Sequence, residues 1–180
     1  CLIPLIDKDQ NKSIEIATEM INSFEKKYEE KWLNMMRDKL GLFGVDEKDK
    51  FLILDLLTWM HQKKVDYTNT FCHLMNENIK EKKNYEDKDF QNWKIRWNER
   101  LKTNNNTPEK YLKLMKNVNP LIIPRNHKVE EALQAADENN LKPITLLIEI
   151  LKDPYSHKKN IHDYQIPSHS DEKYQTFCGT

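Results

Sequence analysis

Glycine is scarce in this chain. Three glycines occur in 180 residues, whereas average usage of about 7% would give roughly a dozen. Loops that wrap phosphates, such as GxxxxGK and GxGxxG, need glycine where the backbone approaches the ligand, and neither pattern occurs. The GxSxG turn of serine hydrolases is missing as well. The scarcity also disfavours hairpin-rich β folds, because their tight turns need positive φ angles.

The chain also lacks an excess of either charge, a long apolar run and a cysteine framework. Its 29 basic residues balance 29 acidic ones, so no net charge attracts nucleic acid or an anionic membrane. The longest apolar run, residues 51–54, is far shorter than the ~20 residues that span a membrane. The first residues lack a signal-sequence pattern, and three cysteines without CxxC spacing form no secreted disulfide framework. We therefore expect a cytoplasmic protein with no nucleic-acid or membrane partner.

Apolar and aromatic residues at helical spacing are what the chain does contain. Four Trp, seven Tyr and six Phe can fill a core, so the polar composition does not imply disorder. Apolar residues recur every three or four positions, which predicts amphipathic helices. We expect a single all-α domain of about seven helices over residues 1–152 and an irregular tail over 153–180. The expected helices cover residues 13–40, 47–63, 67–75, 90–101, 108–118, 126–136 and 144–151.

Residues that begin or end helices mark several of these boundaries. Ser13 is expected to cap the first helix and Gly41 to end it. Asp66 is expected to cap the third helix, and Pro108 to occupy the first position of the fifth. The polar segment 77–88 is expected to form a surface loop.

Arg125 and Asn126 are the first candidate site. They follow the segment 121–123, which lies between two prolines and is expected to be extended. Asn126 is expected to cap the next helix, so Arg125 would lie beside exposed backbone N–H groups. Such an Arg could anchor a carboxylate or a phosphate. The simpler interpretation, which we favour, is a structural clamp in which Arg125 ties down the linker by hydrogen bonds to carbonyls.

The tail holds four residues that can bind metals, namely His157, His162, His169 and Cys178. Their spacings of five, seven and nine residues do not match zinc fingers or ribbons, so we expect no metal site. Cys178 lies two residues from the C-terminus of this sequence, where a thiol is accessible to partners and oxidants. Spacing alone favours an incidental free cysteine.

Several short motifs follow one another in a defined order along the chain. They are residues 36–42 (MRDKLGL), 66–71 (DYTNTF), the aromatic segment 90–101, 115–120 (MKNVNP), 124–126 (PRN) and 153–155 (DPY). Together they resemble the C-terminal part of the selenoprotein O (YdiU) family, in the same order. Cys178 matches the near-terminal cysteine that is selenocysteine in some members.

The resemblance implies a protein adenylyltransferase with a pseudokinase fold. Such enzymes bind ATP with Mg²⁺ and transfer AMP to Ser, Thr or Tyr hydroxyls of target proteins. The family's catalytic and metal-binding residues lie upstream of the matched part, so we assign no catalytic residue and no cofactor to this chain alone. Its expected partners are the N-terminal kinase-like core of the same protein and the protein substrates. Cys178 would carry a redox role through a disulfide with a cysteine of that core.

The chain also departs from the family pattern. Cys72 stands where the family usually has Arg, and Ser168 and His169 follow Pro167 where the family often has P-x-W. The chain begins with Cys1 rather than Met, as expected for a segment of a longer protein. The alternative hypothesis is a stand-alone helical interaction module without catalysis, which the missing nucleotide motif also fits.

Overall fold

The computed structural model describes residues 2–75, 82–103, 106–156 and 161–168. Every regular element in these residues is helical, so the all-α prediction is confirmed. No helix among them is both long enough and apolar enough to cross a membrane. The α-helices are α1 (Gln10–Lys39), α2 (Asp49–Lys63), α3 (Tyr67–Leu74), α4 (Lys88–Lys102), α5 (Pro108–Val118), α6 (Asn126–Asp137), α7 (Lys142–Leu151) and α8 (His162–Gln165), with the 3-10 helices η1 (Ile3–Leu5) and η2 (Lys82–Glu86).

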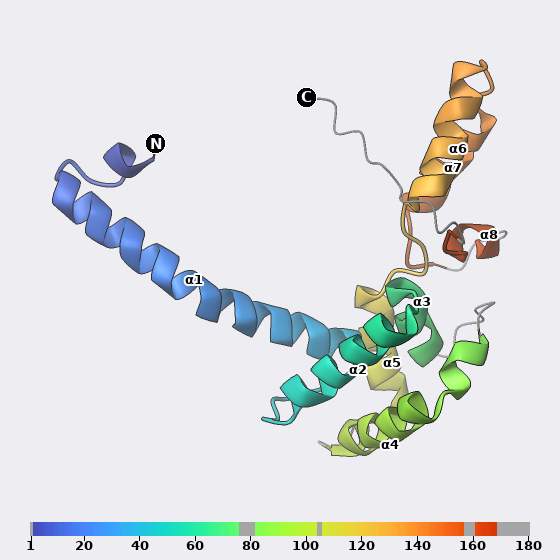
Figure 1. Ribbon diagram of the computed structural model, residues 1–180, viewed down its shortest axis with the longest axis horizontal. Helices are drawn as coiled ribbons and strands as arrows, with labels where there is room; N and C mark the ends of the chain where they lie inside the picture. The colour runs from blue at the N-terminus through green and yellow to red at the C-terminus, as the bar shows by residue number, and fades with distance from the viewer. Residues whose placement is uncertain (1, 76–81, 104–105, 157–160, 169–180) are drawn as a thin grey trace.

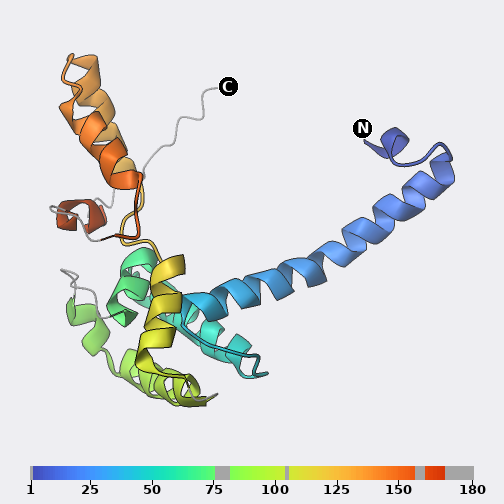
Figure 2. The same ribbon diagram turned by 180° about the vertical axis from the view of Figure 1, so that it is seen from behind.

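The helices form three parts that differ in how they are packed. Figure 1 shows α2 to α5 gathered around the C-terminal end of α1, and we call residues 32–42 together with α2 to α5 the helical body. Residues 10–31, the projecting part of α1, extend away from this body in both views (Figures 1 and 2). Helices α6 and α7 pack against each other as a hairpin on another side of the body.

Aromatic residues of α4 fill the centre of the helical body. Phe90, Trp93, Trp97 and Leu101 are buried because their spacing places them on one side of the helix. Each indole N–H has a backbone partner. Trp93 Nε1 donates to the oxygen of Leu52 at 2.8 Å, and Trp97 Nε1 donates to that of Leu40 at 2.9 Å. These bonds tie α4 to α2 and to the end of α1.

Helix α1 begins three residues before the predicted start, and Ser13 is not its cap. Asp9 is the N-cap, and its carboxylate accepts from the N–H groups of Asn11 and Lys12 at 2.8 and 3.3 Å. Ser13 is buried inside the first turn, where its hydroxyl pairs with both backbone groups of Asp7. The prediction was wrong because both residue types favour N-caps, and Ser13 instead holds the segment before the helix.

Two other boundary predictions are confirmed. Gly41 has a φ of +70°, and the N–H of Leu42 reaches back to the oxygen of Arg37 at 2.9 Å, so α1 ends at a left-handed residue. The carboxylate of Asp66 accepts from the N–H of Asn69 at 2.8 Å and caps α3.

The observed starts of the later helices agree in part with the predicted ones. Pro108 begins α5 as predicted. Asn126 is the first residue of α6 rather than its cap, because Arg125 has the extended backbone of an N-cap residue. Helix α7 begins at Lys142, two residues before the predicted start, since proline fits anywhere in the first turn.

Two segments contain structure that the sequence analysis did not expect. Residues 82–86 of the predicted loop form η2, which buries Tyr85, while residues 77–81 lie outside the described residues. The Tyr85 ring stacks on His73 with centroids 4.0 Å apart. In the predicted irregular tail, α8 forms and buries Gln165. Both were missed because one or two buried side chains in a polar run produce no periodic pattern.

Candidate functional site

Arg125 lies immediately before α6 and binds the carboxylate of Asp66. Its Nη1 and Nη2 atoms donate to Oδ2 and Oδ1 of Asp66 at 2.8 and 3.0 Å. Only 8% and 16% of the two side-chain surfaces are exposed, and two-pronged pairing of this kind is among the strongest charged hydrogen-bonding geometries. The carboxylate that Arg125 holds thus belongs to the chain itself.

The same carboxylate connects three segments that are far apart in the sequence. Asp66 caps α3 at Asn69, and the Asn69 Nδ2 atom donates to the backbone oxygen of Gln165 at 3.0 Å. The Gln165 Nε2 atom donates in turn to the oxygen of Leu121 at 3.0 Å. We call Asp66, Asn69, Arg125 and Gln165 the Asp66 junction. It joins α3, the start of α6 and α8.

Asn126, the second residue of the predicted pair, lies outside this junction. It is exposed on the first turn of α6, whereas Arg125 is buried. The Arg125 Nε atom is also buried and has no hydrogen-bond partner in the described part of the chain. The two neighbours therefore face different surroundings, and only Arg125 takes part in ion pairing.

A second buried ion cluster was missed by the sequence analysis. Asp49 is fully buried and accepts from Arg37 Nε at 2.7 Å and from Arg100 Nε at 2.7 Å. Burial raises the pKa of the Asp49 carboxyl, but the hydrogen bonds from Arg100 and Arg37 outweigh this effect and hold the pKa below its ordinary value. A carboxylate fixed between two guanidinium groups is suited to hold helices together rather than to accept a proton. Arg37 lies in the motif 36–42, which was the one available signal.

Lys39 occupies an unusual position at the end of α1. Its Nζ atom lies over the rings of Tyr67 and Phe71, 5.5 and 4.8 Å from their centroids, and donates to Asn119 Oδ1 at 3.1 Å. Burial lowers the pKa of the Lys39 ammonium, although the interaction with Cys72 opposes this change. The Asn119 amide donates to the backbone oxygens of Lys39 and Met115. Lys39 thus links α1, α3 and the end of α5.

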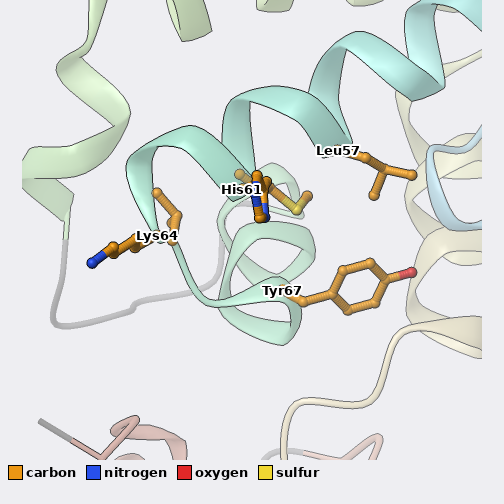
Figure 3. Close-up of a pocket in the computed structure, with 6 residues that line it drawn as sticks. Leu57, His61, Lys64 and Tyr67 are labelled. Carbon is orange, nitrogen blue, oxygen red and sulfur yellow. The ribbon is translucent and has the colours of Figure 1, made fainter. Parts of the chain in front are cut away.

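A pocket of about 450 Å³ opens where α2 ends and α3 begins. Figure 3 shows the Leu57 side chain and the Tyr67 ring on one side of it, with the Lys64 amine directed away. The hydroxyl of Tyr67 donates to the sulfur of Met36 at 3.6 Å, and burial raises the pKa of this phenol. The residues that line the pocket are Leu57, Met60, His61, Lys64, Val65 and Tyr67. With an apolar lining and no carboxylate among those residues, it is suited to an apolar group rather than to acid–base chemistry.

The candidate metal ligands and cysteines are placed only in part. His162 lies in α8, where its ring is 3.2 Å from the side-chain oxygen of Gln165. His157, His169 and Cys178 lie outside the described residues. Within the described ranges, no three His, Cys, Asp or Glu side chains gather as a metal site would require. Cys72 is buried, with its sulfur 3.7 Å from the oxygen of Pro120.

Comparison with known proteins identifies the family to which the chain belongs. The family model described as "Protein adenylyltransferase SelO" matches residues 2–152. The chain belongs to the SelO family. It is 53% identical over 181 residues to a "Protein nucleotidyltransferase YdiU" of Pelagibacter ubique. Proteins with the same name from Alcanivorax borkumensis and Clostridium perfringens strain SM101 are 45% and 42% identical.

These SelO relatives are much longer than the chain. The alignments include 99–100% of this chain but only 37–38% of each of the three relatives. The chain therefore spans well under half the length of the SelO proteins that it matches.

Residues of the SelO-like motifs form several of the ion pairs and hydrogen bonds that connect the helices. Motif 36–42 provides Arg37 for the Asp49 cluster and Lys39 for the contact with Asn119. Motif 66–71 provides Asp66, which meets Arg125 of the motif 124–126. Residues that are scattered along the sequence thus meet in pairs within the fold.

The described part of this SelO chain does not fit a site for ATP and a metal ion. The buried carboxylate of Asp49 and the partly buried one of Asp66 are each held by Arg side chains. No cluster of metal-ligating side chains occurs in that part either. We therefore assign no nucleotide-transfer step to these residues.

Proposed function

We propose that the chain is the C-terminal helical part of a protein adenylyltransferase. In the complete protein, AMP would be transferred from ATP, with Mg²⁺, to Ser, Thr or Tyr hydroxyls of target proteins. The observation that carries this proposal is the SelO family match over residues 2–152. The relatives, which share the name nucleotidyltransferase, agree with it. Because the chain spans 37–38% of those relatives, the activity is proposed for the complete protein only.

We further propose that this part packs on a kinase-like core and transfers no AMP alone. The buried charged groups support a structural role, since Arg37, Arg100 and Arg125 are committed to internal carboxylates. In this proposal the helical part would shape and stabilise the enzyme, while the core would bind the nucleotide.

The test is an adenylylation assay with labelled ATP and Mg²⁺. The complete protein, expressed from its full reading frame, is expected to label itself or added protein substrates. The 180-residue chain, checked for helical content by circular dichroism, is expected to remain unlabelled. Labelling of the chain alone would contradict its proposed structural role. Absence of labelling by the complete protein would contradict the proposal that it is an adenylyltransferase. A reading frame that starts with Met near residue 1 would instead favour the stand-alone interaction module.

We also propose a cytoplasmic location and a redox role for Cys178, both of which follow from the sequence rather than from the described fold. In the complete protein, Cys178→Ser is expected to abolish the response of adenylylation to oxidant. Cys72→Ala is the matched control, because the Cys72 thiol is buried. An equal response in the Cys178 variant and the unaltered protein would remove the redox role.

A further inference from the structure

An apolar stripe runs along the projecting part of α1. Ile14, Ile21, Phe24 and Tyr28 lie on one side of the helix, since they follow one another at seven, three and four residues. Between 45% and 73% of each residue's surface is exposed. The rings of Phe24 and Tyr28 stack with their centroids 6.1 Å apart. We call these four residues the α1 stripe.

The α1 stripe continues a surface that is buried further along the same helix. Trp32 and Met36 follow Tyr28 on the same side, and both pack into the core of the helical body, where Met36 is 1% exposed. Figures 1 and 2 show that α2 to α7 do not extend along most of the projecting part. Helix α2 reaches its last turn through the ion pair between Lys50 and Glu29. One continuous apolar side is therefore covered at its C-terminal end and uncovered over the preceding turns.

The segment before α1 adds to this uncovered surface. η1 folds back on the first turns of the helix through the hydrogen bonds between Ser13 and Asp7. Leu2 and Leu5 are nevertheless 69% and 81% exposed. Apolar surface that extends over several turns marks an interaction site more often than scattered single residues do. An amphipathic helix is also stabilised mainly by the packing of its apolar side.

We propose that the α1 stripe is the surface on which the rest of the complete polypeptide docks, through an apolar groove or face of the part outside this chain. This inference rests on the proposed function, in which the chain is one part of a longer enzyme. Its length supports this occupant, because 62–63% of each relative lies outside the match. A covalently connected partner also acts at a high effective concentration.

A second copy of the chain fits the α1 stripe less well. In a two-helix pairing, Ile14, Ile21 and Tyr28 would occupy one core position of each heptad, and Ala17, Phe24 and Lys31 the other. A small residue and a charged residue would then interrupt the seam. A partner with a different shape can avoid Lys31 and fill the space beside Ala17.

Photo-crosslinking in the complete protein tests the proposal. Benzoylphenylalanine replaces Phe24 in one sample and Lys26, on the opposite side of the same helix, in a matched control. Mixed isotope-labelled and unlabelled protein separates links within one polypeptide from links between two. From position 24 we expect links within one polypeptide to residues outside this 180-residue segment, and from position 26 we expect no such links.

Other results would overturn the proposal. Links from position 24 to a second polypeptide would identify a second copy or another protein as the occupant. A lack of links, or equal links from positions 24 and 26, would show that the α1 stripe is uncovered. The adenylylation assay on the unaltered complete protein is a separate readout. Activity without links rejects only this inference, and links without activity reject only the proposed function.

Hydrogen exchange provides a second measurement that does not depend on the cross-linker. The double variant Ile21→Glu/Phe24→Glu and the single variant Lys26→Glu both lower the net charge of α1 by two. In the complete protein, we expect the double variant to lose amide protection over residues 17–31 and the Lys26 variant to retain it. Equal protection in the two variants would contradict docking on the α1 stripe.

Discussion

The helical body and the projecting part of α1 contain similar apolar residues in very different surroundings. Leu56, Phe90 and Met115 of the body are completely buried. Ion pairs between charged side chains connect the helices around them. Phe24 and Ile21 of the projecting part are 66% and 73% exposed. Apolar spacing alone therefore identifies a helix face that is suited to packing, but it does not identify what covers that face.

The largest expected effect comes from removing the buried carboxylate of the body. Asp49→Ala leaves Arg37 and Arg100 without the charge that they share, and breaking a buried ion pair in this way costs about 3–5 kcal/mol. Urea unfolding followed by circular dichroism measures this loss. Asp46→Ala is the control, because the Asp46 carboxylate accepts a local hydrogen bond from the N–H of Lys48 and is not part of the ionic cluster. An equal loss in both variants would show that the ionic cluster does not stabilise the body.

The Asp66 junction is expected to contribute less, because Asp66 is partly exposed. Arg125→Ala removes three donated hydrogen bonds and leaves a largely buried carboxylate, at a cost of about 1–3 kcal/mol. Arg125→Lys keeps the charge but loses the two-pronged geometry. Its loss in free energy of unfolding should therefore lie between zero and the loss caused by Arg125→Ala. The same unfolding experiment checks this order, and an Arg125→Lys variant less stable than Arg125→Ala would contradict it.

The C-terminal end of α1 lies within the helical body, and its geometry depends on one glycine. A Cβ atom at Gly41 would lie 3.0 Å from Cβ of Tyr111 and 3.1 Å from the side chain of Met115. The positive φ adds about 1–2 kcal/mol for any other residue. We therefore expect Gly41→Ala to lower stability by at least about 1 kcal/mol. An unchanged thermal midpoint in differential scanning calorimetry would contradict this expectation.

Acid should weaken the contact between η2, α4 and the end of α2. The hydrogen bond from Lys63, followed by that from Trp59, lowers the pKa of Asp87 to about 2. The folded state therefore binds the proton of Asp87 less readily than the unfolded chain does, so the stabilisation is present above about pH 4 and is lost between about pH 4 and about pH 2. Thermal midpoints measured over this range should fall less steeply in Asp87→Asn. The same slope in both proteins would rule out a contribution from Asp87.

The smallest effect is expected in the projecting part of α1. Phe24→Ala in the 180-residue chain should change the free energy of unfolding by no more than about 0.5 kcal/mol, because the ring has few contacts to lose. In the complete protein, the same substitution should lower the free energy of unfolding by a larger amount if the α1 stripe is covered there. Urea unfolding of both proteins gives the comparison, and a large loss in the 180-residue chain would contradict the exposed position of Phe24.

Local signals predicted the helices and several of their ends, but they did not predict the ion pairs. Gly41 and Asp66 act through neighbours within a few residues, so their roles could be inferred from the sequence. Asp49 meets Arg100 across 51 residues, and nothing in the sequence near either residue indicates the other. Tyr85 was missed for the same reason, since its neighbours Trp59 and His73 come from other helices.

The sequence by itself determined that the chain is helical and which family it resembles. Both depend on information read along the chain, namely apolar spacing and the order of short motifs. Only the tertiary structure decided that the carboxylate held by Arg125 is that of Asp66, and that the α1 stripe remains largely exposed. The physical reason is that charge pairing and burial depend on distances in space, which residues far apart in sequence acquire only when the helices pack.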